Sequence, residues 1–576
     1  MKEEAVKILK KALDQLAKEK KKEEITLDVS KEQIAKLLEK PPSYDLGDLS
    51  FPCFFLAGKF KENPADIAME IRKNMRDLPD LFLDIQTKGP YINFFINRKQ
   101  LALNLISLVE AQKEKFGSND SGKGRKILIE FSQPNTHKAF HVGHIRGTSV
   151  GESLSRIAEF SNSKVIRANY SGDTGMHIAK WIWCYKKYHS KEKLKNDESW
   201  IASIYVDAVK RLVKNEKLQL EVDEINRKIE SREDKKINEL WKKTRKLSID
   251  SWKKIYEQLR TRFDVHYFES EVEGIGKQKA LDLLEKKIAI KSDDAVIMDL
   301  KQFNLGVWVL LRKDGTVLYS AKDLALAERK VKEFSADDYL VVVGDEQHLH
   351  FQQLVKTLEL MNFTKKDSYK FLTFGMVRLP TGKMSSRTGD NILYSDFIKE
   401  VVDYAVKSIK KRDNKILKKE LEKRALSIAI AAVKFSMLKQ SPSKTIIFNK
   451  EEALQFEGDT GPYLQYSYAR ASSILRKIKK KPEEQDFDSL DEKEEALTKK
   501  ISEFSEIVVK AHQELNPSLI ANYSYQLAQI FNEFYHACPV LEAEEKMFFR
   551  MKLVESFRQV LKNSLSLLGI DVLEEM

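Results

Sequence analysis

The chain has 576 residues and carries 100 basic against 87 acidic side chains, a formal net charge of +13. Hydrophobic residues make up 42% of it, which is enough for several cores and too much for a disordered protein. The length predicts three or four domains. The basic excess favours a polyanionic partner such as nucleic acid, although a lysine-rich solvated surface would produce the same balance.

The three cysteines, Cys53, Cys184 and Cys538, are isolated and show no metal-ligand spacing. The sequence therefore predicts neither a disulfide framework nor a zinc site. No stretch is apolar enough to cross a membrane, and the amphipathic pattern at the start lacks the apolar core of a signal peptide. We expect a cytoplasmic protein without a membrane contact or a metal site of its own.

The first part of the chain, residues 1–115, has the pattern of a small α+β domain. Helical spacing of apolar residues is seen near 3–20, 30–38 and 64–75. Two strands are predicted around the Lys88-Gly89-Pro90 turn, at Phe82–Gln86 and Tyr91–Ile96. A polar segment rich in Gly, Ser, Asp and Lys, Gly117–Lys123, closes this domain.

Strands then alternate with helices over residues 124–400. Strands at Lys126–Phe131 and Lys164–Tyr170 flank a helix at Ile145–Phe160, which predicts a parallel, nucleotide-binding sheet. A charged helical insertion interrupts this pattern at about 185–290. Further strands of the sheet are predicted near Val307–Leu311, Val317–Ser320, Tyr339–Val343 and Phe371–Val377.

Residues 401–576 are almost continuously helical apart from a polar break at Lys481–Asp491, which predicts a helical bundle. The predicted fold class is therefore α/β. A parallel Rossmann-type domain with a helical insertion lies between an N-terminal α+β domain and a C-terminal all-α bundle.

The first chemical motif is His141-Val142-Gly143-His144, which follows the strand at Lys126–Phe131 and opens a helix. A helix N-terminus offers unpaired N–H groups and a positive dipole end to phosphate. The glycine allows a ribose or base to approach the backbone closely. His141 and His144 can donate to phosphate oxygens, and Lys138 adds a cation nearby.

The second motif is Lys383-Met384-Ser385-Ser386, in a loop with a glycine on each side. A lysine and hydroxyl groups suit the stabilisation of charge that develops on a departing pyrophosphate. Either motif alone could be a structural histidine pair or a solvated basic turn. Both together, each after a strand, predict an ATP site. No GxxxxGK[ST] phosphate loop and no GxGxxG after a strand compete with this interpretation.

Six stretches together resemble the arginyl-tRNA synthetases, a class I aminoacyl-tRNA synthetase family. They are Glu130–Arg146, Tyr319–Asp323, Val341–Gln353, Phe374–Gly389, Phe456–Arg470 and Asn522–His536. The resemblance covers nearly the whole chain. It implies ATP-dependent ligation of L-arginine to tRNA-Arg through an arginyl-adenylate, with release of pyrophosphate and AMP. The family's Gly-Asp-Trp-Gly is Gly172-Asp173-Thr174-Gly175 here.

The resemblance also implies roles for individual residues. His141, His144 and Lys383 would be catalytic, and the ATP-binding set would be His141, Gly143, His144, Gly344, His348, Met376, Val377, Lys383, Ser385 and Ser386. Arginine would contact Glu130, Asn135, Tyr319, Asp323 and Gln347. Asp323 and Tyr319 would face the guanidinium, for which a carboxylate is the natural partner.

Contacts with tRNA are implied at both ends of the chain. In the C-terminal bundle, which would bind the anticodon, they are Tyr463, Gln465, Tyr466 and Arg470. In the N-terminal domain, which would contact the tRNA elbow, they are Tyr91 and Asn93. The resemblance further implies Mg²⁺ bound with ATP, and we expect a monomer.

Three other functions compete with this prediction. The first is another class I synthetase, such as one for cysteine or glutamine; an enzyme for cysteine would need a zinc site, which the cysteine spacing does not favour. A paralogue that only binds tRNA would have no use for His141, His144 and Lys383. A nucleotidylyltransferase would share the first motif but would not explain the helical C-terminal third.

Overall fold

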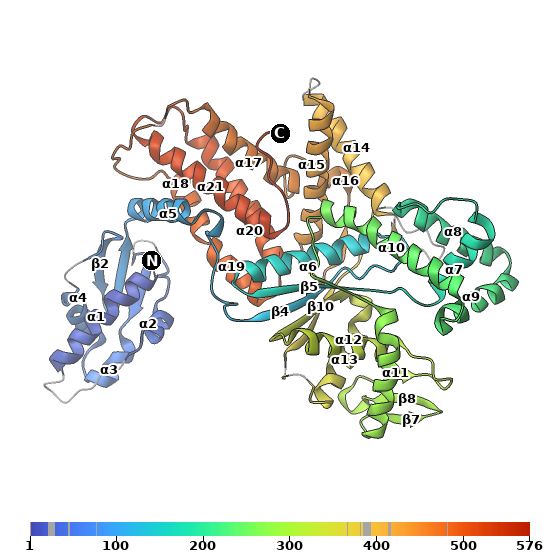
Figure 1. The fold of residues 1–576 in the computed structure, drawn as a ribbon. Helices are drawn as coiled ribbons and strands as arrows, with labels where there is room; N and C mark the ends of the chain where they lie inside the picture. Colours follow the sequence, from blue (N-terminus) through green and yellow to red (C-terminus); the bar gives the residue numbers. More distant parts are fainter. Residues whose placement is uncertain are drawn as a thin grey trace. The chain divides into compact units, whose positions relative to one another are not determined.

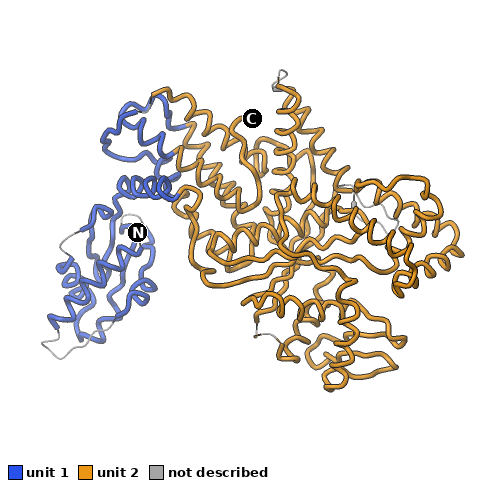
Figure 2. Tube along the Cα trace, in the orientation of Figure 1, with its two compact units in different colours: residues 1–112, 482–499, 537–553 blue, residues 113–481, 500–536, 554–576 orange. Residues whose placement is uncertain are grey.

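The computed structural model divides into two compact units, which Figure 2 distinguishes by colour. Unit 1 comprises Met1–Gln112, Pro482–Lys499 and Ala537–Leu553, and unit 2 comprises the rest. The described residues are 2–20, 29–43, 46–75, 78–363, 365, 367–380, 382–383, 393–412, 416–480 and 482–576, with backbone alone at 382, 383 and 412.

Unit 1 holds a three-stranded antiparallel sheet in the order β1-β3-β2. The strands are β1 (Leu49–Pro52), β2 (Phe82–Lys88) and β3 (Tyr91–Ile96). Within residues 1–112 they are accompanied by the helices α1 (Lys2–Lys20), α2 (Lys31–Leu37), α3 (Phe54–Phe60), α4 (Pro64–Lys73) and α5 (Arg98–Gln112). The apolar faces of α1 to α4 form one core with the strands, and α1 buries Leu9, Leu13 and Leu16 in it. The α+β fold predicted for the start of the chain is confirmed.

Unit 2 is built on a five-stranded parallel sheet in the order β11-β10-β4-β5-β6. Its strands are β4 (Lys126–Glu130), β5 (Lys164–Ser171), β6 (Val265–Phe268), β10 (Asp338–Gly344) and β11 (Tyr369–Phe374). The strand order reverses between β4 and β10, and ligands of such sheets bind beyond the carboxyl ends of the strands at this switch point. The predicted parallel Rossmann-type sheet is confirmed.

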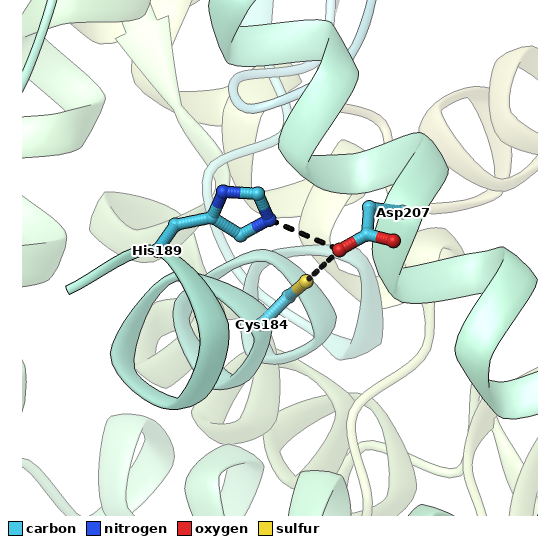
Figure 3. Close-up of side chains that lie close together, drawn as sticks. All are labelled: Cys184, His189 and Asp207. Atoms are coloured by element: carbon cyan, nitrogen blue, oxygen red, sulfur yellow. Dashed lines mark hydrogen bonds and ion pairs between the residues drawn. The ribbon is translucent and has the colours of Figure 1, made fainter. Parts of the chain in front are cut away.

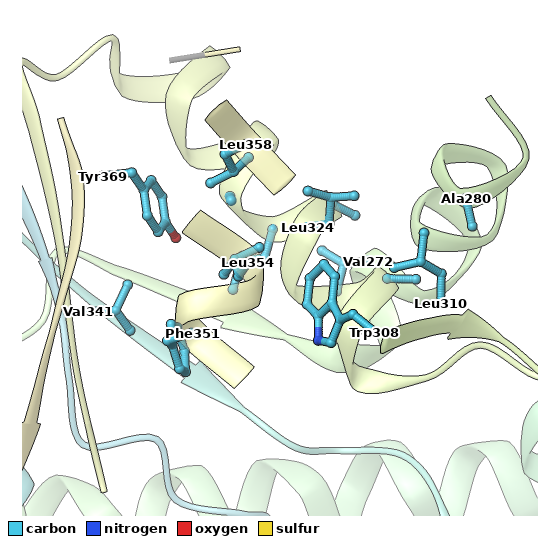
Figure 4. Close-up of a cluster of buried hydrophobic side chains, with 14 of the residues drawn as sticks. Val272, Ala280, Trp308, Leu310, Leu324, Val341, Phe351, Leu354, Leu358 and Tyr369 are labelled. Carbon is cyan, nitrogen blue, oxygen red and sulfur yellow. The ribbon is translucent and has the colours of Figure 1, made fainter. Parts of the chain in front are cut away.

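Helices cover both faces of this sheet (Figure 1). On one face lies α6 (Val142–Phe160), and on the other lie α12 (Tyr319–Phe334) and α13 (His348–Leu360). The second face carries a large apolar core, in which Val341 of β10 joins Leu324 of α12 and Leu354 of α13 (Figure 4). Burial of both faces explains why the strands read as continuous apolar runs in the sequence.

The stretch predicted as a helical insertion follows α7 (Met176–Cys184) and contains four α-helices. They are α8 (Glu198–Lys214), α9 (Gln219–Ser231), α10 (Lys235–Gln258) and α11 (Glu269–Glu285). The same stretch also contains β6, the edge strand of the main sheet. A four-residue strand is too short to show a period of its own among charged helices.

Two strand predictions after this stretch were wrong in detail. Val307–Leu311 is a strand, β9, but it pairs antiparallel with β8 (Ala295–Asp299) in a separate sheet that also includes β7 (Ile290–Ser292). Val317 forms only an isolated bridge, and the predicted strand at 317–320 instead runs into the start of α12. The short apolar run at 317–320 is compatible with a strand or with the start of a helix, and tertiary packing makes it the start of α12.

Residues 401–576 are mainly helical, as predicted. The helices are α14 (Tyr394–Arg412), α15 (Lys418–Leu438), α16 (Lys450–Ala453), α17 (Gly461–Lys477), α18 (Glu492–Ser502), α19 (Phe504–Gln513), α20 (Ser518–Ala537) and α21 (Met547–Leu567). A small sheet of β12 (Val377–Leu379), β13 (Gly382–Lys383) and β14 (Ile446–Ile447) precedes and interleaves with them. Among the described residues, no helix combines the length and apolarity needed to cross a membrane.

Candidate active site and tRNA-binding surfaces

A cavity of about 440 Å³ lies at the switch point of the parallel sheet. Residues that follow β4 and β10 line it, together with the start of α6 and the first turn of α12. The sequence-predicted residues that it brings together are Glu130, Asn135, His141, Gly143, His144, Tyr319, Asp323, Gly344 and Gln347. Predicted ATP and arginine contacts from three distant segments, 130–144, 319–323 and 344–347, therefore share one cavity.

The first motif forms the N-terminus of α6. His141 is the N-cap residue, and its backbone N–H donates to Nδ1 of His144 at 3.1 Å. Because that nitrogen accepts, a neutral His144 carries its proton on Nε2 and can donate from there. The two rings stack with centroids 3.9 Å apart. Burial, together with the nearby Lys138 cation, lowers the pKa of His141 to about 4.

Both histidines are therefore neutral donors near pH 7. For His144, burial and then the neighbouring His141 and Lys138 hold the pKa well below 6.5. Lys138 does not line the cavity, and its ammonium lies 5.6 Å from the centre of the Tyr205 ring. Burial, reinforced by the nearby Lys180, also lowers the pKa of Lys138.

Three further predicted ATP contacts that the structure describes, His348, Met376 and Val377, do not line the cavity. His348 is exposed at the start of α13, and its ring packs edge-on against Phe371. Met376 is 49% exposed, whereas Val377 is buried in the core beside α14 and α15. Of Lys383 only the backbone is described, in β13, where it pairs with Arg378. Ser385 and Ser386 lie outside the described residues.

Glu130 forms a buried ion pair with Lys330 of α12. The other carboxylate oxygen of Glu130 accepts from Nε2 of Gln133 at 3.0 Å, and Lys330 also contacts the Tyr369 hydroxyl at 3.3 Å. Glu130, which was predicted to contact arginine, is thus balanced by a cation of the protein itself. The Lys330 partner lies 200 residues further along the chain, so no sequence motif contained both.

Glu269 is a cavity residue that sequence reasoning missed. It is the first residue of α11, is buried, and lines the same cavity as Asp323. Burial raises the pKa of Glu269 to about 7, and Asp323 reinforces this shift while Lys322 opposes it. Two carboxylates of one cavity, one of them costly to ionise, suit a cationic ligand. Its position directly after β6 would have indicated it, had that strand been recognised.

Asn135 and Gly172 are in close contact at the cavity wall. A Cβ on Gly172 would lie 2.2 Å from Oδ1 of Asn135, so only glycine leaves this amide in place. Thr174, which replaces the family's tryptophan, donates to Glu269 at 3.3 Å.

Two further predicted arginine contacts are exposed. Tyr319 is 64% exposed, and Gln347 is exposed as well. These two side chains therefore stand at the open side of the site.

Three side chains of the kinds that bind metals, Cys184 at the end of α7 and His189 and Asp207 in the helical insertion, meet away from this cavity (Figure 3). Nε2 of His189 is 3.0 Å from Asp207, and the thiol of Cys184 donates to the same carboxylate at 3.4 Å. Although burial opposes it, hydrogen bonds to Glu192 and Asp207 raise the pKa of His189. Arg211 also donates to Asp207, at 2.7 Å. The Asp207 carboxylate is therefore already paired with hydrogen-bond donors from Cys184, His189 and Arg211.

A cavity of about 580 Å³ lies beside α17. Tyr466 and Arg470 line it, and the Arg470 guanidinium packs 4.8 Å from the Tyr466 ring centre and 5.1 Å from that of Tyr535. The predicted contact Gln465 is fully buried instead, and its amide nitrogen donates to the carbonyl of Asp571 at 2.7 Å. Tyr463 is half-buried, and its hydroxyl accepts from Asn532.

In unit 1, Tyr91 and Asn93 lie on β3. Tyr91 is half-buried, and its ring packs edge-on at 5.5 Å against Phe54, which is 53% exposed. Asn93 is buried, and its side-chain oxygen accepts from the hydroxyl of Ser50 at 2.7 Å. Tyr91 and Phe54 thus form the accessible aromatic pair of this domain, whereas Asn93 stabilises the sheet.

Three family descriptions match the chain and together cover most of it. Residues 3–96 match "Arginyl tRNA synthetase N terminal domain", residues 105–450 match "tRNA synthetases class I (R), catalytic domain", and residues 464–576 match "DALR anticodon binding domain". In chain order, the three matched segments correspond to the antiparallel sheet of unit 1, the parallel sheet of unit 2 and the C-terminal helices.

Individual relatives agree with this assignment. The arginine–tRNA ligase of Clostridium botulinum (strain Loch Maree / Type A3) is 35% identical over 97% of the chain and 99% of the relative. That of Clostridium acetobutylicum is 36% identical over 96% and 98%. The structure of Thermus thermophilus arginyl-tRNA synthetase superimposes with a TM-score of 0.76 at 26% identity, covering 97% of this chain and 98% of the other. The chain belongs to the arginyl-tRNA synthetase family.

Proposed function

We propose that this protein ligates L-arginine to tRNA-Arg, with ATP as the energy source and an arginyl-adenylate as the intermediate. One observation carries the assignment beyond family membership. The cavity joins a helix N-terminus with two neutral histidine donors to a pair of carboxylates, Glu269 and Asp323. Anionic phosphates and a cationic guanidinium can therefore bind side by side.

In the first step a carboxylate oxygen of arginine attacks the α-phosphorus of ATP. The new C–O–P bond forms as the bond from the α-phosphorus to pyrophosphate breaks, and pyrophosphate leaves with the electron pair. The protein donates no covalent partner, so its contribution is positioning and charge stabilisation. His141 and His144 supply N–H donors toward the phosphates, and Gly143 leaves room for the nucleotide.

The second step transfers the arginyl group to tRNA. The terminal adenosine's 2′-hydroxyl attacks the activated carbonyl carbon, the mixed anhydride C–O bond breaks, and AMP leaves with the electron pair of that bond, while the hydroxyl proton passes to a phosphate oxygen of the departing AMP. We include Mg²⁺ in the proposal as the counter-ion of ATP, bound mainly through phosphate oxygens and water. The exposed carboxylate of Glu346 lines the same cavity and is an oxygen ligand of the kind that Mg²⁺ accepts.

Selection of arginine follows from the carboxylate pair. A guanidinium presents parallel N–H donors to a carboxylate, whereas a lysine ammonium is a point charge that leaves part of the site unpaired. Buried acceptors that lose their partner carry a large free-energy cost, so discrimination at the binding step suffices without a second, hydrolytic site.

The cavity beside α17 is our proposed contact with the anticodon loop. Its aromatic rings and the Arg470 guanidinium suit stacking of unpaired bases. In unit 1, the exposed side of the pair formed by Tyr91 of β3 and Phe54 of α3 is the proposed contact with the tRNA elbow. A monomeric state and a cytoplasmic location complete the proposal, in line with three buried free thiols.

The test is aminoacylation of total tRNA with each labelled amino acid in turn, in the presence of Mg-ATP. We expect incorporation of arginine alone, with AMP and pyrophosphate formed in equal amounts. Charging with another amino acid would reassign the substrate. Tight tRNA binding without charging by any amino acid would identify a binding-only paralogue.

A further inference from the structure

Two hydrogen bonds link the indole of Trp308 to the carboxylate of Asp323 through one histidine. Nε1 of Trp308 lies 3.3 Å from Nδ1 of His350, and Nε2 of His350 lies 2.7 Å from Oδ2 of Asp323. The indole and imidazole rings pack edge to face with centroids 5.4 Å apart. Trp308 is buried, and the side chains of His350 and Asp323 are about one-fifth or less exposed.

The chemistry of the indole sets the direction of both bonds. An indole N–H can only donate, so Nδ1 of His350 must accept. A neutral His350 then carries its proton on Nε2 and donates it to Asp323. A proton on Nδ1 would face the indole N–H and lose this bond. Trp308 therefore holds His350 in the neutral tautomer that donates to the carboxylate.

The three residues come from three different elements. Trp308 lies on β9 of the small antiparallel sheet, His350 on α13 and Asp323 on α12. Figure 4 shows the Trp308 side chain within the core that packs these elements together. Of the three, only Asp323 lines the 440 Å³ cavity. His350 and Trp308 can therefore influence a ligand there only through Asp323.

We propose that His350 is a positioning residue for arginine specificity, which rests on the proposed function of the cavity. Its N–H occupies Oδ2 of Asp323, fixes the carboxylate rotamer and leaves Oδ1 for the guanidinium. A neutral donor does this without cancelling the negative charge that arginine needs. Trp308, which does not line the cavity, keeps His350 in the tautomer with its proton on Nε2. A histidine is commonly oriented in this way by the partner of its second nitrogen.

The decisive variants are His350→Leu, His350→Gln and Trp308→Phe. In His350→Leu we expect the KM for arginine to rise about tenfold or more, with the KM for ATP and for tRNA within twofold of wild type. His350→Gln keeps an amide donor within reach of Asp323, so it should recover most of the affinity for arginine. Trp308→Phe keeps the ring but removes the N–H, and it should raise the arginine KM a few-fold.

Two controls separate positioning from folding. Trp183→Phe removes another indole N–H, which donates to Glu221 at 2.8 Å in the insertion, and should leave the arginine KM unchanged. The double variant Asp323→Asn/His350→Leu should be no worse for arginine than Asp323→Asn alone, because His350 acts through Asp323.

Additive losses in that double variant would overturn the inference. So would an unchanged arginine KM in His350→Leu, or an equal rise in the KM for arginine and ATP. If His350→Leu does not fold, His350→Gln and Trp308→Phe still test it through the order of their arginine KM values. Failure of the wild-type protein to charge arginine would instead refute the proposed function, so the two failures are distinguishable.

Discussion

Nδ1 of His144 accepts the backbone N–H of His141 at 3.1 Å, so the first motif caps its own helix. The same side chain therefore has a structural nitrogen and a chemical one. Nδ1 satisfies an otherwise unpaired N–H at the helix start, and Nε2–H remains for a phosphate oxygen. A histidine at this position performs both tasks, which no residue with a single polar atom can do.

Two substitutions separate these tasks. In His144→Asn the side-chain oxygen can take over the cap, but no donor reaches the phosphates. We expect arginine-dependent pyrophosphate exchange, measured with tRNA present, to fall about 10²- to 10³-fold at an unchanged melting temperature. His144→Gln should retain more exchange activity, because its longer amide can place a donor near the position of Nε2. The reverse pattern would assign the donor role to another residue.

Glu269 predicts a pH dependence of arginine use. Its pKa is raised to about 7, so below pH 7 the carboxyl is mostly protonated in the free protein. Binding of a guanidinium requires the ionised form, so each arginine bound below pH 7 should release a proton. We expect kcat/KM for arginine to rise about tenfold per pH unit up to pH 7 and then level off. Glu269→Gln should abolish that slope and most of the activity.

The raised pKa of Glu269 also predicts that the stability of the ligand-free protein falls with rising pH, whereas the use of arginine rises. The unfolded carboxyl titrates near 4.5, whereas the folded one holds its proton to about pH 7. Between these values the folded state binds more protons, so its stability falls as pH rises through this window. Glu269→Gln should therefore stabilise the ligand-free protein by up to about 3 kcal/mol at pH 8 and hardly at pH 4. Thermal melting at the two pH values measures this difference.

Gly172→Ala should move Asn135 without touching the ATP side of the cavity. The added Cβ would lie 2.2 Å from the Asn135 amide oxygen, so that side chain must shift. We expect the KM for arginine to rise about tenfold while the KM for ATP changes little. Gly274→Ala is the matched control, because a Cβ there meets nothing within 4 Å and should slightly stabilise α11. A normal arginine KM in Gly172→Ala would remove Asn135 from the substrate contacts.

Neighbouring residues of α17 should separate tRNA binding from folding. Tyr466→Ala removes an aromatic wall of the 580 Å³ cavity and should weaken tRNA binding by about 1–3 kcal/mol at an unchanged melting temperature. Gln465→Ala leaves the Asp571 carbonyl without its buried donor and should lower the melting temperature instead. A filter-binding titration at fixed salt, alongside thermal melting, distinguishes the two. Equal effects of both substitutions on tRNA affinity would refute the division.

The relation of α17 to its neighbours shows where prediction from sequence stopped. Helical spacing predicted a helix that carries aromatic and polar residues. Gln465 and Tyr466 are adjacent and both have a polar group, so the sequence pattern does not tell which of the two is buried. Only the packing of α17 against α15 and residues near Asp571 buries one and leaves the other at a cavity. In the same way, the short strand β6 was hidden by the charged helices around it, and Glu269 with it.

By itself the sequence determined the features that depend on neighbours along the chain. The strand, the turn and the capped start of α6 are set by local period and residue type, and so His141, Gly143 and His144 could be named in advance. Tertiary structure decided how charges are paired in the cavity. Lys330 neutralises Glu130 and His350 orients Asp323 across long separations in the chain, because a carboxylate removed from water must be paired with donors that the protein itself supplies.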